Sequence, residues 1–275
     1  MLRYVKINII LGDHQEKPLD FLGSTLRGAF GIALKKIVCI NPKYKCLDCF
    51  ALKNCLYYDF FEQKNKPHTY RFSKPLKEDN FNFSLYLFEE ACEKLPYVLS
   101  AIVKMVTELG LGVQRQKFTI ENILCNDLQV YKNGAFDFSS VILRTFESDE
   151  CASNITLHLS TPLRMKHDNK LLNTKPNLEL ILTSIMNRLN EIKDLPQIRL
   201  PYKPSYRETH SSIVFTDLTR YSNRQHTKMQ LGGIKGHISY EELDERSYIL
   251  LKLGEILGVG KQTVFGLGEI KIEKS

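Results

Sequence analysis

Residues 108–118, ELGLGVQRQKF, and residues 255–265, EILGVGKQTVF, are two versions of one short pattern. Each copy follows an apolar stretch with helical spacing, passes through Gly-x-Gly and continues into basic or amide residues. Because glycine permits backbone conformations that other residues rarely adopt, each copy is expected to turn the chain from a helix into a strand. Two such turns at the same step of a fold predict an internal duplication.

The apolar residues around these turns predict a similar order of elements in both halves. In the first half they indicate strands at residues 5–9, 81–87 and 110–123, and helices over 22–37 and 95–109. In the second half they indicate strands at 155–159, 211–218, 232–240 and 266–272, and helices that follow the capping residues Asn177 and Asp244. Strand, helix, two strands, helix, strand is the ferredoxin-like arrangement.

The sequence therefore predicts an α+β protein with two tandem ferredoxin-like (RRM-like) βαββαβ domains. Its 275 residues suit two domains of moderate size. We place the N-terminal domain at residues 1–130, with a four-cysteine loop inserted at 39–55. The C-terminal domain then spans 131–275 and carries an RYSNRQ hairpin at 220–225 and a C-terminal glycine-rich loop.

The composition narrows the class of partner only slightly. With 38 lysines and arginines against 31 aspartates and glutamates, the formal net charge is +7. This excess suits a polyanionic partner and equally a mildly basic soluble protein. No apolar run approaches the roughly 18 residues of a membrane span, and the N-terminal apolar stretch alternates like a strand, unlike a signal peptide. We therefore expect a cytoplasmic protein with no membrane partner.

Four of the seven cysteines are close together in the sequence: Cys39, Cys46, Cys49 and Cys55. An odd number of cysteines in an unsecreted chain argues against a disulfide framework. Thiolates are good tetrahedral ligands, and two cysteines separated by two residues form a common half of a zinc site. A structural zinc ion is favoured over an iron–sulfur cluster on the same sulfurs, and four free thiols in a basic loop are the third alternative.

The stretch before the last predicted strand contains the glycines Gly258, Gly260, Gly266 and Gly268. It lacks the Gly-x4-Gly-Lys-Ser/Thr order of a P-loop, and it follows a helix, whereas a dinucleotide-binding fingerprint follows a strand. Backbone without side chains leaves amide N–H groups free to meet phosphate oxygens, and Lys261 adds a positive charge. The alternative is a tight helix-to-strand turn with a bulge.

Residues 258–272, GVGKQTVFGLGEIKI, resemble the glycine-rich loop and last strand of the repeat-associated RAMP superfamily. Together with RYSNRQHTKMQLGGIKGHISY at 220–240, they resemble the C-terminal domain of the CRISPR pre-crRNA-processing endoribonuclease family. FLGSTLRGAFGIALKKIVC at 21–39, with the three cysteines that follow, is similar to the start of those proteins. The glycine-rich loop is shared by non-catalytic RAMP subunits, so the RYSNRQ stretch is the more selective part.

The resemblance implies metal-independent cleavage of a CRISPR repeat RNA, without a catalytic cofactor. The ribose 2′-OH attacks the neighbouring phosphate and leaves a 2′,3′-cyclic phosphate and a 5′-OH. Such a reaction needs a base, an acid and cations around the developing negative charge. Much of the family uses a histidine just beyond the first helix, a tyrosine in that helix and a lysine after it. Here the matching helix position is Gly31, and only Lys53 matches the lysine.

Other residues must therefore supply the chemistry. The catalytic candidates, with the histidine first because of its basic neighbours, are His226, Tyr221, Tyr44, Lys45 and Lys53. Side-chain contacts with the RNA are expected from Arg27, Arg220, Arg224, Gln225 and Lys261. His158 interrupts a strand and is assigned a structural role, and His210 and His237 have no distinguishing neighbours in the sequence. The alternative is a non-catalytic RNA-binding RAMP subunit of a CRISPR effector complex, with other effector subunits as partners; the missing family histidine favours it.

Overall fold

The structure, a computed structural model, describes all residues except 13–17, 133, 140, 149, 168–169 and 223–226. The chain forms two compact units, Leu2–Thr145 and Phe146–Ser275. This boundary differs from the one expected at residue 130, because the residues after 130 still belong to the N-terminal sheet. There β5 (Leu128–Lys132) pairs with β4 (Ile120–Cys125), and β6 (Ala135–Phe136) pairs with β5.

The N-terminal unit contains an antiparallel sheet whose main strands have the ferredoxin-like order β2-β3-β1-β4. β5 and β6 extend the sheet beyond β4, and β7 (Arg144–Thr145) pairs with β1. The other strands are β1 (Arg3–Leu11), β2 (Tyr70–Ser73) and β3 (Phe83–Phe88). Alternation along β1 buries Val5, Ile7 and Ile9 on one face, as predicted.

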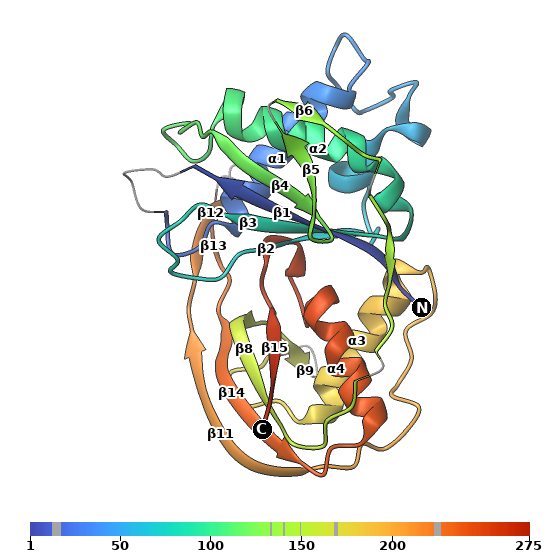
Figure 1. Cartoon of the computed structure of the whole chain (residues 1–275), viewed down its shortest axis with the longest axis vertical. Coiled ribbons are helices and arrows are strands. Elements are labelled where there is room, and N and C mark those ends of the chain that lie inside the picture. Colours follow the sequence, from blue (N-terminus) through green and yellow to red (C-terminus); the bar gives the residue numbers. More distant parts are fainter. Residues whose placement is uncertain (13–17, 133, 140, 149, 168–169, 223–226) are drawn as a thin grey trace. The chain divides into compact units, whose positions relative to one another are not determined.

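Two helices cover this sheet. α1 (Gly23–Val38) packs against α2 (Leu95–Val103), as Figure 1 shows. Shorter helical turns are η1 (Leu52–Asn54), η2 (Tyr58–Glu62), η3 (Glu89–Lys94) and η4 (Lys104–Leu109). Leu26 and Phe30 of α1 are fully buried, as the helical spacing predicts. Ile37, at the end of the helix predicted over 22–37, is exposed in the last turn of α1.

The C-terminal unit repeats the arrangement, with the strand order β11-β14-β8-β15. Its main strands are β8 (Ile155–Leu163), β11 (Arg207–Thr216), β14 (Gly233–Glu241) and β15 (Ile270–Lys274). The helices α3 (Leu178–Ile192) and α4 (Glu245–Leu257) pack together. Smaller elements are β9 (Lys166–His167), β10 (Lys170–Leu171), β12 (Thr219–Ser222), β13 (Thr227–Gln230) and η5 (Thr263–Phe265).

The predicted helix starts and the predicted duplication are both confirmed. The carboxamide oxygen of Asn177 accepts a hydrogen bond from the N–H of Leu180 at 2.8 Å, and Asp244 caps α4 in the same way. The two Gly-x-Gly turns share one backbone conformation: φ is 75° at Gly110 and 73° at Gly258. The two units therefore repeat a turn as well as a strand order.

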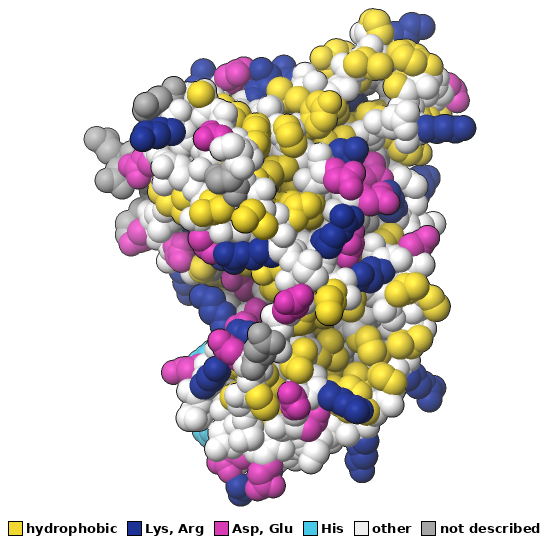
Figure 2. Space-filling model, turned by 45° about the vertical axis from the view of Figure 1, so that its right-hand side comes forward, with side chains coloured by type: hydrophobic (Ala, Val, Ile, Leu, Met, Phe, Trp, Pro, Cys, Tyr) yellow, Lys and Arg dark blue, Asp and Glu magenta, His cyan; other side chains and the backbone are white. Residues whose placement is uncertain are grey.

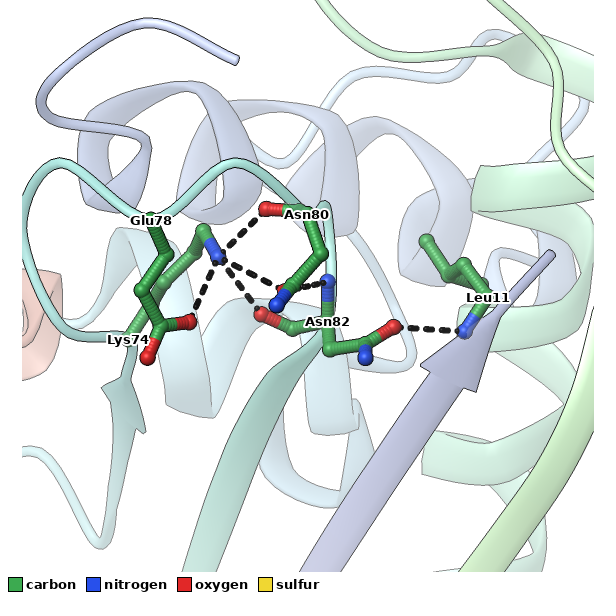
Figure 3. A network of polar contacts seen from close by, with 5 residues as sticks. All are labelled: Leu11, Lys74, Glu78, Asn80 and Asn82. Atoms are coloured by element: carbon green, nitrogen blue, oxygen red, sulfur yellow. Dashed lines mark hydrogen bonds and ion pairs between the residues drawn. The ribbon is translucent and has the colours of Figure 1, made fainter. Parts of the chain in front are cut away.

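A buried lysine fixes the connection between β2 and β3 (Figure 3). Lys74 Nζ donates to the carbonyl oxygens of Asn80 at 2.7 Å and Asn82 at 2.9 Å, and pairs with Glu78 at 3.3 Å. The side chain of Asn82 then accepts from the N–H of Leu11 at the end of β1, at 2.8 Å. Burial lowers the pKa of Lys74, while Glu78 opposes this. The network ties the β2–β3 loop to the end of a central strand.

Among the described residues, no helix combines the length and the apolar character that a membrane crossing requires.

Candidate functional site

One face of α1 carries two glycines, Gly28 and Gly31. Two rows of residues spaced by four run along this face: Arg27, Gly31 and Lys35 in one, Gly28, Ile32 and Lys36 in the other. A Cβ atom on Gly28 would meet no heavy atom within 4 Å, so its position opens to empty space. A Cβ atom on Gly31 would lie 2.8 Å from the ring of Phe61. The missing side chain of Gly31 therefore makes space for the ring of Phe61, and that of Gly28 leaves an open space at the surface of the helix.

Two aromatic rings next to the helix hold two of its cations. The rings of Tyr57 and Phe61 stack with centroids 5.4 Å apart and an interplanar angle of 14°. The guanidinium of Arg27 lies 4.9 Å from the centroid of Phe61, and Lys35 Nζ lies 4.8 Å from that of Tyr57. Such cation–π contacts contribute about 0.5–1 kcal/mol each at exposed sites. Each ring therefore favours one position of the neighbouring cation.

These groups line a pocket of about 290 Å³. The residues that line it are Arg27, Gly28, Gly31, Ile32, Lys35, Lys36, Tyr44, Tyr57 and Phe61. Three of them are cationic, two carry a phenolic hydroxyl, and none is a carboxylate. The Glu62 carboxylate does not line the pocket, although it accepts a hydrogen bond from the Tyr57 hydroxyl at 3.1 Å. Three lining cations can neutralise a phosphate, and the volume suits one phosphodiester with its sugar better than a duplex.

A buried tyrosine lies behind the pocket. Complete burial raises the pKa of the Tyr70 hydroxyl to about 12, although the nearby Arg27 guanidinium acts in the opposite direction. The ring of Tyr70 lies 5.9 Å from that of Phe61 and 4.7 Å from that of Phe60. Tyr70 therefore stays protonated at neutral pH and serves as a rigid support for Arg27.

The pocket contains two of the residues expected from the sequence. Tyr44 and Arg27 both line it. Lys45 and Lys53 are exposed on the loop after α1 and do not line it. Lys35 and Lys36 were missed as site residues, together with both stacked rings. Spacing by four along the helix, from Arg27 to Lys35 and from Gly28 to Lys36, is the signal in the sequence that could have identified the two lysines.

The RYSNRQ hairpin is only partly described. Arg220 and Tyr221 lie on β12, which pairs with β13 through Arg220 opposite Met229 and Tyr221 opposite Lys228. This confirms the expected hairpin. Arg224, Gln225 and His226 lie outside the described residues, so their predicted roles stay predictions.

The glycine-rich loop corrects the sequence-based interpretation. The N–H groups of Gly258, Gly260, Gly266 and Gly268 donate to Gly254 O, Ser184 Oγ, Thr263 O and Pro162 O, respectively. Gly258, Gly266 and Gly268 are also buried. The expected contacts of these amides with phosphate are therefore wrong, because internal acceptors already use every one of them. Of the residues in this loop that were expected to contact phosphate, Lys261 is exposed and Gly260 is half-buried.

Close packing explains why these positions are glycine. A Cβ atom on Gly268, where φ is 68°, would lie 1.8 Å from the carbonyl oxygen of Val259. A Cβ atom on Gly260 would lie 2.5 Å from that of Arg164. The loop therefore packs its backbone against the segment that follows β8, and the tight-turn alternative is the correct one.

The cysteine loop lies beside the pocket. Partial burial raises the pKa of the Cys46 thiol, while the ammonium of Lys35 acts in the opposite direction. Cys39, Cys46, Cys49 and Cys55 are all free thiols. Zinc needs four ligand atoms within about 2.3 Å of one point, and no three His, Cys, Asp or Glu side chains of the described residues are grouped to hold a metal ion. The structural zinc ion stays a prediction.

The same loop carries apolar side chains to the surface. Leu47 is 83% exposed and Phe50 is 78% exposed. Figure 2 shows hydrophobic side chains gathered, with lysines and arginines, at the top of the view.

Comparison with known proteins matches the two halves of the chain to two family models. A family model described as CRISPR-associated endoribonuclease Cas6 matches residues 157–270, and a model described as an N-terminal domain, AF_1859_N, matches residues 3–142. The C-terminal half of the chain therefore carries a domain of the Cas6 type of CRISPR-associated endoribonuclease. An uncharacterized protein of Archaeoglobus fulgidus is 25% identical to this chain over an aligned length of 276 positions, and the match covers 92% of this chain and 91% of that protein.

Several solved structures share the fold of this chain. A Cas6 product complex matches with a TM-score of 0.58 and 15% identity over 99% of both chains. Thermus thermophilus Cas6 matches with a TM-score of 0.57 and 14% identity over 99% of this chain and 98% of that chain. An RAMP protein that binds different RNA substrates matches with a TM-score of 0.50 and 14% identity over 99% and 100%. The tandem ferredoxin-like fold is confirmed.

Proposed function

We propose that this protein is a metal-independent endoribonuclease that binds CRISPR repeat RNA and cuts one phosphodiester. The observation that carries the proposal is the pocket on α1, with three cations, the Tyr44 hydroxyl and no carboxylate. The match of residues 157–270 to the Cas6 family model supports RNA as the substrate, as do similar solved structures described as a Cas6 product complex and a Cas6 substrate mimic complex.

The reaction needs no atoms beyond those of the RNA. The 2′-oxygen forms a bond with the adjacent phosphorus, and the bond from phosphorus to the 5′-oxygen breaks. One proton leaves the 2′-OH and one reaches the 5′-oxygen, which gives a 2′,3′-cyclic phosphate and a 5′-OH. Negative charge grows on the phosphorane oxygens, and cations fixed beforehand stabilise it more than mobile ones. Arg27 and Lys35, held by the ring stack, fill that role.

Two further groups of the pocket can move protons. Lys36 is exposed at the rim, so its ammonium can reach the leaving 5′-oxygen and donate to it. Tyr44 is half exposed, and its hydroxyl can hold the 2′-OH while that proton passes to water. His226 stays a predicted alternative base.

Cleavage of repeat RNAs in EDTA tests the reaction. We expect one cut per repeat, a cyclic phosphate on the upstream product, and complete loss of cutting when the 2′-OH at that position is replaced by hydrogen. Cleavage that needs a divalent metal ion, or that survives the deoxy substitution, would contradict the mechanism.

Substitutions test the pocket itself. Lys36→Arg keeps the charge but removes a usable proton, because a guanidinium does not deprotonate in proteins. We expect RNA binding close to wild type and cleavage about 100-fold slower, with a roughly tenfold loss for Tyr44→Phe. Lys45→Arg and Lys53→Arg are the matched controls on the adjacent loop. If Lys53→Arg abolishes cleavage and Lys36→Arg does not, the pocket is not the active site.

A second function is favoured by one observation. Among the described residues, no histidine lines the pocket. A non-catalytic RNA-binding subunit of a CRISPR effector complex would bind repeat RNA through the same cations without cutting it. Tight binding without cleavage of every repeat tested, together with copurification of other effector subunits, would select this function.

A further inference from the structure

Three histidines form a row across the sheet of the C-terminal unit. His158 on β8 is paired in register with His237 on β14, and their ring centroids are 6.0 Å apart. His210 on β11 stacks on His237, with centroids 5.4 Å apart and an interplanar angle of 29°. In the sequence, His158 and His210 are 52 positions apart, and His210 and His237 are 27 positions apart. Only the sheet brings the three imidazoles together.

The row lies on the face of the sheet that turns away from the core. Leu157 and Leu159, the neighbours of His158 along β8, are buried, so alternation points His158 outward. His210 is exposed, and the side chain of His158 is 40% exposed. The register between β14 and β8 shifts between Ile234 and Gly236, with the additional residues on β8. The register between β11 and β14 shifts by one extra β11 residue just before His210. Bulges re-aim the side chains beside them, so the irregularity in β11 helps to set the position of His210.

The surroundings of the row are polar and partly cationic. The carboxylate of Glu273 on β15 accepts a hydrogen bond from Nε2 of His158 at 2.8 Å, and Lys271, also on β15, lies opposite His158. Among the described residues, His210 and His237 have no hydrogen-bonding partner. The metal alternative fails on geometry, because no three metal-ligating side chains of the described residues are grouped to hold an ion.

We propose that this histidine row is a stacking platform for unpaired bases of the bound RNA. An RRM-like four-stranded sheet presents planar side chains from its strands to single-stranded RNA, and bases stack on aromatic rings, histidine included. Three rings on three neighbouring strands, on an exposed face with a lysine beside them, match that requirement. The proposal rests on the proposed function for the identity of the ligand, but it names a surface separate from the pocket on α1.

The protein contains no tryptophan, which makes a direct test possible. In full-length His237→Trp, the introduced indole is the sole tryptophan of the chain, and a base that stacks on it quenches its fluorescence. The probe is a short oligouridine with 2′-O-methyl groups, which the proposed reaction cannot cut. We expect saturable quenching by this probe and none by an abasic oligomer with the same phosphates. Tyr97→Trp, at an exposed position on α2, is the matched control and should not be quenched.

Affinity measurements complete the test. By fluorescence anisotropy, His237→Gln should bind the labelled probe about fivefold more weakly or worse, and His237→Tyr should restore binding. Absence of quenching, equal quenching by the abasic oligomer, or binding by His237→Gln within twofold of wild type each overturns the platform. Because the probe cannot be cut, these results do not depend on cleavage: failure of the proposed reaction leaves them readable, and failure of the platform leaves cleavage assays of the pocket unchanged.

Discussion

Substitutions of Gly28 distinguish the stability that this glycine costs the helix from the phosphate binding that it is proposed to permit. Gly28 lies inside α1, where glycine is about 1 kcal/mol less favourable than alanine. A Cβ atom there would touch no heavy atom within 4 Å, so nothing opposes the gain. We expect Gly28→Ala to stabilise the N-terminal unit by about 0.5–1 kcal/mol and to raise its Tm by about 2–6 °C.

Gly28→Glu should leave the fold intact and remove the function. Glutamate is nearly as good a helix former as alanine, so the stability should equal or exceed that of wild type. Its carboxylate enters the space assigned to a phosphate. Two unit charges about 6 Å apart in an effective dielectric constant of about 20 repel by roughly 3 kcal/mol, which corresponds to a loss of about 100-fold in RNA affinity or cleavage.

The assay is thermal unfolding together with single-turnover cleavage, or RNA affinity if the protein only binds. Gln129→Glu on β5 is the matched control, because it adds the same charge at an exposed position of the same unit. If folded Gly28→Glu binds and cleaves RNA as wild type does, the pocket on α1 is not the phosphate site.

Three further predictions concern other parts of the chain. Gly268→Ala should destabilise the protein by about 2 kcal/mol or more in urea unfolding, while Lys261→Ala, at an exposed position, should change stability by less than about 0.5 kcal/mol; equal effects would contradict the packing argument. Burial raises the pKa of Tyr70 to about 12, so between about pH 10 and pH 12 the unfolded chain loses this proton and the folded chain keeps it. The free energy of unfolding should therefore fall as the pH rises through this range, and Tyr70→Phe should lessen the fall by about 2–3 kcal/mol. Parallel pH profiles of the two proteins would refute this. Elemental analysis should find about one zinc ion per chain, lost on combined Cys46→Ser and Cys49→Ser, and a metal-free wild type purified without chelators would end the zinc prediction.

The fold could be predicted because its signals are local. Alternation along β1, the caps Asn177 and Asp244, and the two Gly-x-Gly turns each follow from a few neighbouring residues. Backbone conformation at Gly110 and Gly258 is nearly the same, so the sequence repeat reflects a repeat in structure. Boundaries were less certain, since β5 and β6 carry no signal that assigns them to the first sheet.

The site could be predicted only in part because its members come from separate segments. Tyr44 and Arg27 were identified individually, but the stack of Tyr57 on Phe61 depends on how the loop after α1 folds back over the helix. The histidine row is a stronger case. His158 and His210 are far apart in sequence, and pairing of β8 and β11 with β14 decides that they meet.

Glycine has two opposite uses in this protein, and the surroundings of the missing Cβ atom distinguish them. At Gly268 the Cβ atom would strike a backbone oxygen, and the N–H already has an internal acceptor, so the residue is required for packing. At Gly28 the Cβ atom would meet nothing, although glycine weakens the helix there. A destabilising residue that relieves no internal contact is understandable if a ligand needs the space. We therefore place the proposed phosphate site on the helix with the open glycine, whereas the packed backbone of the glycine-rich loop stabilises the fold.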